Sequence, residues 1–136
     1  MSIKLYLASP FSDKDKMPEL AKQFEDRGFV ITRKWWEVED KTEAEKTPQF
    51  LRGEALSDIE GVKAANVVVL FNTKKSEGKA VEQGIAIANN IPIFAIGKRG
   101  AFSKNVFHYL EHYFWVETLH DVLVILDFIK AVCKRS

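Results

Sequence analysis

Hydrophobic residues in this chain gather in short runs that alternate with stretches of helical spacing. Five runs predict strands, at residues 3–8, 29–32, 67–71, 91–96 and 113–116. The run at 67–71 contains no polar residue, which is typical of a strand buried on both faces of a parallel sheet. The chain therefore offers a series of strands separated by segments long enough to cross back over a sheet.

The segments between these runs repeat apolar residues every three or four positions, as amphipathic helices do. The predicted inner faces are Met17, Leu20, Ala21 and Phe24; Leu51, Ala55, Leu56, Ile59 and Val62; Val81, Ile85 and Ala88; and Leu119, Val122, Leu123, Leu126, Ile129 and Cys133. Gly28 is a plausible helix stop. Residues 104–110 predict a short helix, and the charged stretch 37–47 predicts a flexible loop because it lacks apolar periodicity.

Strict alternation of strands and helices predicts an α/β fold. We expect residues 1–136 to form a single three-layer domain, with helices on both faces of a five-stranded parallel sheet and right-handed crossovers. Five strands favour the flavodoxin-like, Rossmann-like order 2-1-3-4-5.

Composition narrows the class of protein. The net charge is +1 over 136 residues, which supplies no long-range field to recruit a nucleic acid polymer. No apolar run is long enough to span a bilayer, and residues 1–6 lack the apolar region of a signal peptide. The single cysteine, Cys133, cannot form an internal disulfide, and its place on an apolar helix face predicts a packing role. We expect a cytoplasmic protein without membrane contact.

Candidate chemistry centres on Glu82. It lies one turn into the helical pattern that follows the strand 67–71, where open α/β sheets build ligand crevices. The helix dipole favours the ionised form of a carboxylate there. Such a carboxylate can bind a sugar hydroxyl or attack an anomeric carbon. The plainer alternative is a favourable dipole charge without a catalytic role.

Other polar residues would share this crevice. The segments 6–12, 72–82 and 97–103 follow strands one, three and four and should converge at one rim. Asp58 would reach the rim only if its helix runs past the crevice. Tyr6 alternates along a buried strand and could serve only the core, while Ser76 could be only a helix cap.

Four segments carry a family resemblance. Residues 5–11 (LYLASPF), 58–66 (DIEGVKAAN), 77–86 (EGKAVEQGIA) and 103–106 (SKNV) appear in the order found in the nucleoside 2-deoxyribosyltransferase family, which this chain resembles over most of its length. Each motif alone is weak, whereas the four together are moderately specific.

The resemblance implies a mechanism. Glu82 would attack the anomeric carbon of a 2-deoxynucleoside, release the base and leave a glycosyl-enzyme ester that water or a second base resolves. Asp58 would hydrogen-bond the sugar or assist the leaving base, and Tyr6 would place the nucleophilic carboxylate. This chemistry requires no cofactor and no metal.

The resemblance and the residue types also imply the substrate contacts, which are Ser9, Phe11, Trp35, Ser76, Gly78 and Asn105. Trp35 and its neighbour Trp36 could form an aromatic wall for a base. Ser76 stands where the transferases carry an aspartate and where the related deoxynucleoside 5′-monophosphate N-hydrolases carry serine. Asn105 instead matches a transferase residue that serves the 5′ end of the sugar, in a segment that resembles one reaching into the neighbouring subunit's site, which implies a homodimer or larger homo-oligomer. Transfer and hydrolysis therefore both remain open.

Two other classes of function remain. The chain could be a catalytically silent nucleotide-binding module, because a fold alone never settles activity. It could also be a glutamate-dependent glycohydrolase of a dinucleotide such as NAD. The basic pair Lys98 and Arg99 lies on the predicted rim and could meet a phosphate. His108, His112 and His120 show no spacing that requires a metal.

Overall fold

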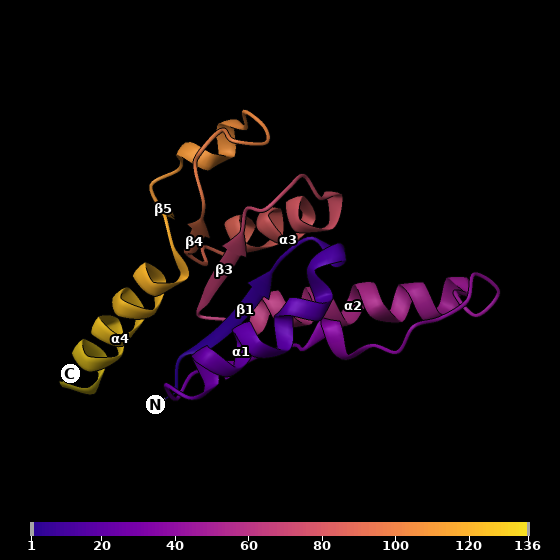
Figure 1. The fold of residues 1–136 in the computed structure, drawn as a ribbon, viewed down its shortest axis with the longest axis horizontal. Coiled ribbons are helices and arrows are strands. Elements are labelled where there is room, and N and C mark those ends of the chain that lie inside the picture. Colours follow the sequence, from indigo (N-terminus) through magenta and orange to yellow (C-terminus); the bar gives the residue numbers. More distant parts are fainter. Residues whose placement is uncertain (1, 136) are drawn as a thin grey trace.

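The computed structural model describes residues 2–135 and contains a five-stranded sheet in the order β2-β1-β3-β4-β5 (Figure 1). The strands are β1 (Lys4–Ala8), β2 (Val30–Ile31), β3 (Val67–Phe71), β4 (Ile93–Ile96) and β5 (Tyr113–Val116). All neighbouring pairs are parallel. The expected α/β class, strand order and orientation are thus confirmed, with β1, β2 and β4 shorter than the hydrophobic runs that predicted them.

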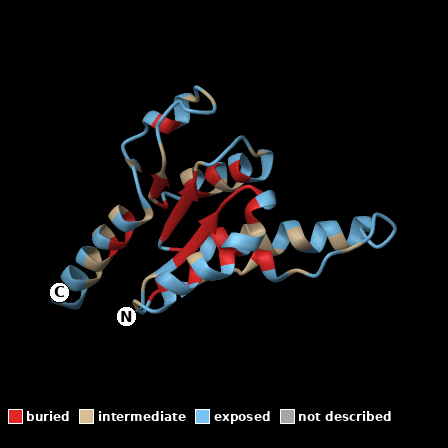
Figure 2. Ribbon diagram, viewed as in Figure 1, coloured by how far each residue is buried: buried red, intermediate tan, exposed pale blue. Residues whose placement is uncertain are grey.

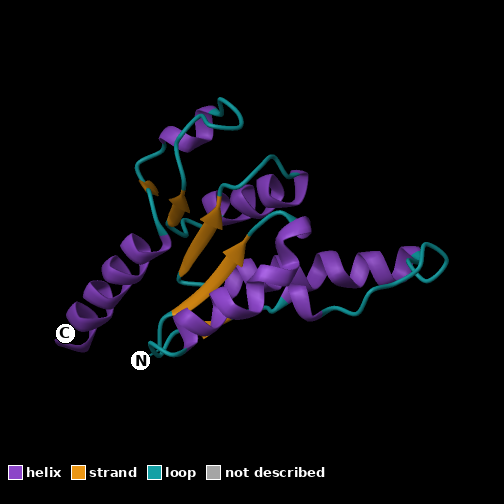
Figure 3. Ribbon diagram, in the orientation of Figure 1, coloured by secondary structure: helices purple, strands orange, loops and turns teal. Residues whose placement is uncertain are grey.

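Helices connect the strands and cover both faces of the sheet (Figure 3). The α-helices are α1 (Met17–Glu25), α2 (Pro48–Ala64), α3 (Glu77–Ala88) and α4 (Leu119–Arg135), and the short 3-10 helices are η1 (Phe11–Lys16), η2 (Trp35–Glu37) and η3 (Val106–Tyr109). On one face α2 and α3 pack together and against β1. On the other, Arg27 just after α1 forms an ion pair with Asp127 of α4.

The core is the sheet itself. All of β3 and all but the first residue of β1 are buried (Figure 2). Met17 and Phe24 of α1 and Val122 and Leu126 of α4 are fully buried against it. Burying an aliphatic or aromatic side chain stabilises the fold by roughly 1.5–3 kcal/mol, so this apolar layer holds the strands in place.

Local signals set the helix ends. The side chain of Ser76 accepts a hydrogen bond of 3.2 Å from the Lys79 amide and starts α3, and Thr47 caps α2 in the same way ahead of Pro48. Gly28 has φ +89°, a left-handed conformation that L side chains rarely adopt, and it follows the last turn of α1.

Two helices, α2 and α3, bury a different face from the one that their apolar residues predicted. In α3 the buried residues are Lys79, Gln83 and Ala86, whereas Val81 is 61% exposed. Gln83 is accommodated inside because its Oε1 accepts a 2.7 Å hydrogen bond from the hydroxyl of Tyr113. In α2 Leu51 is likewise exposed. Some apolar residues of α2 and α3 therefore face solvent or the cavity described below. The apolar spacing alone did not reveal which side of each helix packs against the sheet.

The expected packing role of Cys133 is wrong, because the residue is exposed. The reason is length. A helix of 17 residues such as α4 extends about 25 Å, whereas β4 and β5 have 4 residues each and extend about 13 Å. The last turns of α4 therefore run beyond the sheet, and Val132 is exposed there too.

Candidate active site

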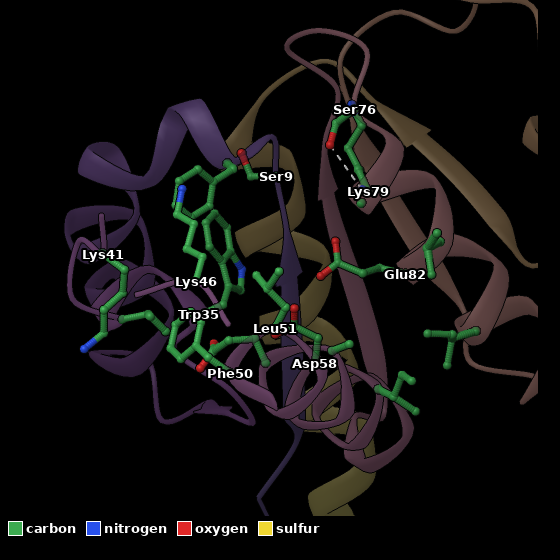
Figure 4. A pocket seen from close by; sticks show the side chains of 18 of the residues that line it. Ser9, Trp35, Lys41, Lys46, Phe50, Leu51, Asp58, Ser76, Lys79 and Glu82 are labelled. Atoms are coloured by element: carbon green, nitrogen blue, oxygen red, sulfur yellow. Dashed lines mark hydrogen bonds between the residues drawn. The ribbon is translucent and has the colours of Figure 1, made fainter. Parts of the chain in front are cut away.

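A cavity of about 600 Å³ opens between α2 and α3 beside the carboxyl ends of β1 and β3 (Figure 4). It is lined by Ser9, Phe11, Trp35, Val38, Glu39, Asp40, Lys41, Lys46, Phe50, Leu51, Glu54, Ala55, Asp58, Ile59, Ser76, Gly78, Lys79, Val81, Glu82 and Ile85. We call it the main cavity. The residues 38–41 and 46, from the stretch expected to be only a flexible loop, form part of its wall.

Glu82 and Tyr6 meet at this cavity. Tyr6 lies on β1 with its side chain fully buried, and its hydroxyl donates a hydrogen bond to Oε2 of Glu82 on α3. Figure 4 shows the Glu82 carboxylate projecting into the cavity. The buried position of Tyr6 therefore serves both alternatives raised by the sequence: the ring belongs to the core, and the hydroxyl reaches the site.

The protonation of Glu82 is set by competing effects. Burial raises the pKa of Glu82, the hydrogen bond from Tyr6 lowers it, and the nearby charge of Asp58 raises it, with a net pKa of about 7. The sequence suggested that the helix dipole would favour ionisation. Desolvation outweighs that effect here, because Glu82 lies past the first turn of α3, where the dipole has largely decayed.

Asp58 reaches the same cavity from α2, so that helix does run past the crevice. Its Oδ1 accepts a 3.1 Å hydrogen bond from Nε of Arg33, and the same guanidinium donates to Glu54 one turn earlier in α2. Burial raises the pKa of Asp58, while Arg33 pulls it down. The two carboxylates of α2 are thus held by one cation at the edge of the cavity.

Close approach of α2 to the sheet depends on Gly61. A Cβ at this position would lie 2.7 Å from Cβ of Arg33 and 3.1 Å from the ring of Tyr6. Gly61 is one turn after Asp58, on the same side of the helix. The absence of a side chain therefore allows Tyr6, Arg33 and Asp58 to converge.

Aromatic side chains line another part of the cavity. Nε1 of Trp35 donates a 2.8 Å hydrogen bond to the carbonyl of Leu7, which fixes the indole beside β1. Its ring centroid lies 6.3 Å from that of Phe11 and 5.5 Å from that of Trp36. Trp35 itself lines the cavity, whereas Trp36 packs behind it. A planar group could stack in this region.

Ser76 and Lys79 line a second, smaller cavity as well, of about 240 Å³. The ammonium of Lys79 donates to the carbonyl of Lys74 at 2.7 Å. Asn105 lines this second cavity and not the main one, and its Oδ1 accepts a 2.9 Å hydrogen bond from the amide of Phe107. Within one chain, then, Asn105 is not brought to Glu82, and its expected role in a neighbouring subunit stays a prediction.

The structure thus places Tyr6, Ser9, Phe11, Trp35, Asp58, Ser76, Gly78 and Glu82 at or against the main cavity. The sequence reasoning missed Arg33 and Glu54. Arg33 lies two residues after the end of β2, a strand end left out of the predicted rim, and Glu54 lies four residues before Asp58 on one helix face. Lys98 and Arg99 line neither described cavity, and Arg99 lies 4.5 Å from the ring centroid of Tyr109.

Among residues 2–135, no group of three or more His, Cys, Asp or Glu side chains is arranged to hold a metal ion. Over the same residues, no helix is both long enough and apolar enough to cross a membrane.

Comparison with known proteins defines the fold class. No family model matches the chain, and no curated protein does. Solved structures do match, and all three described here share this α/β fold at low identity. A conserved protein from Enterococcus faecalis V583 is 18% identical, with a TM-score of 0.64 over 91% of this chain and 96% of that one.

The other two matches have described activities. A 2-deoxyribosyltransferase from Bacillus psychrosaccharolyticus is 19% identical, with a TM-score of 0.62 over 88% of this chain and 89% of its own. The CMP N-glycosidase BcmB from Clostridium botulinum is 16% identical, with a TM-score of 0.62 over 93% of this chain and 98% of its own. The chain therefore shares the fold of enzymes that act on N-glycosidic bonds, in agreement with the resemblance seen in the sequence.

Proposed function

We propose that this protein cleaves the N-glycosidic bond of a 2-deoxynucleoside or its 5′-monophosphate through a covalent intermediate on Glu82. The observation that carries the proposal is the pairing of Glu82 with the buried Tyr6 hydroxyl inside a cavity that also holds Asp58. Two carboxylates beside one bond are the usual requirement for retaining glycosyl transfer. The shared fold with a 2-deoxyribosyltransferase and a CMP N-glycosidase supports the same class.

In the proposed first step, a carboxylate oxygen of ionised Glu82 forms a bond to the anomeric carbon as the bond from that carbon to the base nitrogen breaks. The base leaves with the bonding electron pair and gains a proton. The proton comes from water, and Asp58, whose carboxylate is paired with Arg33, is the candidate to relay it to the base. Tyr6 donates to Oε2 of Glu82, which leaves Oε1 as the attacking atom.

In the second step, water or another base attacks the anomeric carbon, and Glu82 departs as a carboxylate. Water gives hydrolysis, and a base gives transfer. Asp58 would now take a proton from the attacking water or from the attacking nitrogen of the second base. The proposal includes both outcomes, because the cavity of about 600 Å³ has room for either acceptor.

The cavity also suggests how the substrate is held. The base would stack against Trp35 and Phe11, whose rings lie side by side in the wall. Ser76 and Gly78 lie at the start of α3, where backbone amides and the positive end of the dipole favour an anionic group such as a 5′-phosphate. Ser9 would provide a further polar contact.

The proposal extends to a homodimer or larger homo-oligomer in which Asn105 serves a neighbouring site. Aromatic side chains close to Asn105 in sequence are unusually exposed, namely Phe102, Phe107, Tyr109 and Phe114. Aromatic residues are enriched at subunit interfaces, so this surface suits a second copy of the chain. Light scattering of wild-type protein and of Phe107→Ser would test it, since the variant should dissociate more readily.

The test of the activity is chromatographic. Deoxynucleosides, ribonucleosides and their 5′-monophosphates would be incubated with the protein, with and without a second free base. Release of base that is lost in Glu82→Ala and retained in Glu77→Ala supports the proposal, because Glu77 is an exposed glutamate of the same helix outside the main cavity. A new nucleoside that appears only with the second base indicates transfer.

Other outcomes of the same assay would contradict the proposal. Binding of nucleosides without any release of base would indicate a binding module. Release that survives in Glu82→Ala would exclude Glu82 as the nucleophile. Release of nicotinamide from NAD with no action on the nucleoside panel would favour a dinucleotide glycohydrolase.

A further inference from the structure

A buried carboxylate with no part in the proposed reaction lies against the wall of the main cavity. Asp13 of η1 is 8% exposed. Its Oδ2 accepts hydrogen bonds from the hydroxyl of Thr73 at 2.5 Å and from the hydroxyl of Ser9 at 3.3 Å. Ser9 follows β1 and Thr73 follows β3, so this one carboxylate ties together the ends of two neighbouring strands.

The negative charge of Asp13 determines which group donates and which accepts in these two hydrogen bonds. The hydroxyl of Thr73 lowers the pKa of Asp13, and the ammonium of Lys16 4.0 Å from Oδ1 acts in the same direction. An ionised carboxylate only accepts hydrogen bonds, so both hydroxyls must donate to it. A serine hydroxyl has a single hydrogen. The hydrogen of Ser9 therefore points at Asp13, and its lone pairs remain for other partners.

Ser9 is itself a wall residue of the main cavity and is 7% exposed. We propose that Asp13 is a positioning residue that presents Ser9 to the cavity as a hydrogen-bond acceptor, so that the site selects ligands carrying an N–H or O–H group at this point. The inference rests on the proposed function, since it assumes a nucleoside-like ligand. The donor would be an exocyclic amine of the base or a hydroxyl of the sugar.

Selection follows from what a mismatched ligand would meet. A carbonyl oxygen at the same point would face the lone pairs of Ser9. To donate a hydrogen bond to that carbonyl, Ser9 would have to turn its hydroxyl hydrogen away from Asp13. The buried carboxylate of Asp13 would then lose one of its hydrogen bonds. Loss of a hydrogen bond to a buried charged group is expected to reduce affinity by about tenfold or more.

Binding measurements separate this inference from the catalytic proposal. Calorimetry would use the Glu82→Gln protein, so that ligands stay intact. The amine arm compares 2′-deoxyadenosine with 2′-deoxyinosine and 2′-deoxycytidine with 2′-deoxyuridine. The sugar arm compares thymidine with 3′-deoxythymidine. We expect one arm to show a preference of about tenfold for the ligand with the donor.

Further substitutions in the Glu82→Gln protein would test whether Asp13 causes the preference. Ser9→Ala and Asp13→Ala should reduce the ratio of the two affinities to about one, whereas Asp13→Asn, which keeps an oxygen acceptor, should retain most of it. Asp15→Ala is the matched control, because Asp15 is an exposed aspartate of the same 3-10 helix and should leave the ratio unchanged.

Several results would overturn the inference. One is the absence of a preference in both arms, and another is a preference that survives in Asp13→Ala. A third is an equal loss of affinity for both ligands of a pair in Asp13→Ala, which would mean that Asp13 only supports the loop. If Asp13→Ala does not fold, a preference that persists in Ser9→Ala overturns it instead. If the preference for the donor ligand is found but protein that retains Glu82 releases no base, the catalytic proposal alone is refuted. If no ligand binds, both the catalytic proposal and this inference are refuted.

Discussion

The hydroxyl of Tyr6 on β1 donates a hydrogen bond to Oε2 of Glu82 on α3, across 76 positions of sequence. This contact joins the buried sheet to the carboxylate that we propose as the nucleophile in the main cavity. It also stabilises the charged form of Glu82 against the opposing effect of burial.

Tyr6→Phe should shift the acidic limb of the pH–rate profile. Removing the hydroxyl removes the interaction that lowers the pKa of Glu82, so the pKa rises above about 7 and the ionised nucleophile forms only at higher pH. We expect the midpoint of the limb in kcat/KM to move up by about one pH unit, with activity partly recovered at high pH. Initial rates of base release from pH 5 to 9 would measure it.

The matched control is Tyr113→Phe. Tyr113 is also a buried tyrosine with a hydrogen-bonded hydroxyl, but its partner is Gln83 and it does not line the main cavity. Its removal should leave the limb in place. A Tyr6→Phe profile with an unmoved midpoint and a uniformly lower rate would show that the hydroxyl does not control ionisation.

Glu82→Gln should make the protein more stable at alkaline pH. A carboxyl whose pKa rises on folding binds more protons in the folded state than in the unfolded state between its ordinary pKa of 4.5 and its folded-state pKa of about 7. The stability of the wild type therefore falls as pH rises through this window and stays reduced above it. At pH 8 the variant should be more stable by on the order of 1–2 kcal/mol, or about 3–8 °C in Tm.

Thermal denaturation at pH 8 and pH 4.5 would test this. The advantage of Glu82→Gln should shrink toward zero at the lower pH, where the wild-type carboxyl is protonated in the folded state. Glu77→Gln, at an exposed site of the same helix, should give no such gain. An equal gain at both pH values would point to packing instead of ionisation.

Arg33→Ala should destabilise the protein near neutral pH more than at acidic pH. The guanidinium offsets two part-buried carboxylates, Asp58 and Glu54, which repel one another when it is gone. Because these side chains are 35% and 33% exposed, solvent screens the effect, and we expect a loss of about 1 kcal/mol at pH 7. Protonation of the carboxyls at pH 4 should relieve most of it.

Urea titrations at the two pH values would measure the difference. Lys22→Ala breaks a solvent-exposed pair with Asp26 and should leave the urea midpoint essentially unchanged. Arg33→Lys should recover part of the stability by keeping the charge, although a lysine cannot donate to both carboxylates in the same fork geometry. A loss in Arg33→Ala that is equal at both pH values would argue against an electrostatic role.

Gly61→Ala and Gly53→Ala should act in opposite directions, although both lie in α2. A Cβ at 61 would lie 2.7 Å from Arg33 and 3.1 Å from Tyr6, and relieving this overlap should cost about 1–3 kcal/mol and displace the Tyr6 hydroxyl. Nothing lies within 4 Å of a Cβ at 53, so alanine there should stabilise the helix by roughly 0.5–1 kcal/mol.

Denaturation midpoints of the two variants, together with rates of base release, would check this pair. Gly53→Ala should keep wild-type activity, whereas Gly61→Ala should lose activity as well as stability. Full activity in Gly61→Ala would mean that the convergence of Tyr6 and Asp58 tolerates a shift of α2.

Local sequence patterns were sufficient to predict the order of the elements, the parallel sheet and the location of Glu82. These depend on local periodicity and on the rule that consecutive strands joined by right-handed helical crossovers lie parallel. The position of Glu82 past the end of β3 was sufficient to place it at the carboxyl edge of the sheet, where Ser76 and Gly78 also lie.

The helix faces that meet the sheet could not be predicted from the sequence, because they depend on tertiary contacts. Gln83 and Lys79 turn inward while Val81 faces out, because Tyr113 and the carbonyl of Lys74 provide partners that the helix's own pattern cannot reveal. Likewise Arg33 meets Asp58 across 25 positions of sequence. Such contacts depend on how whole elements rotate and approach one another, at Gly61 above all, and no local pattern encodes that approach.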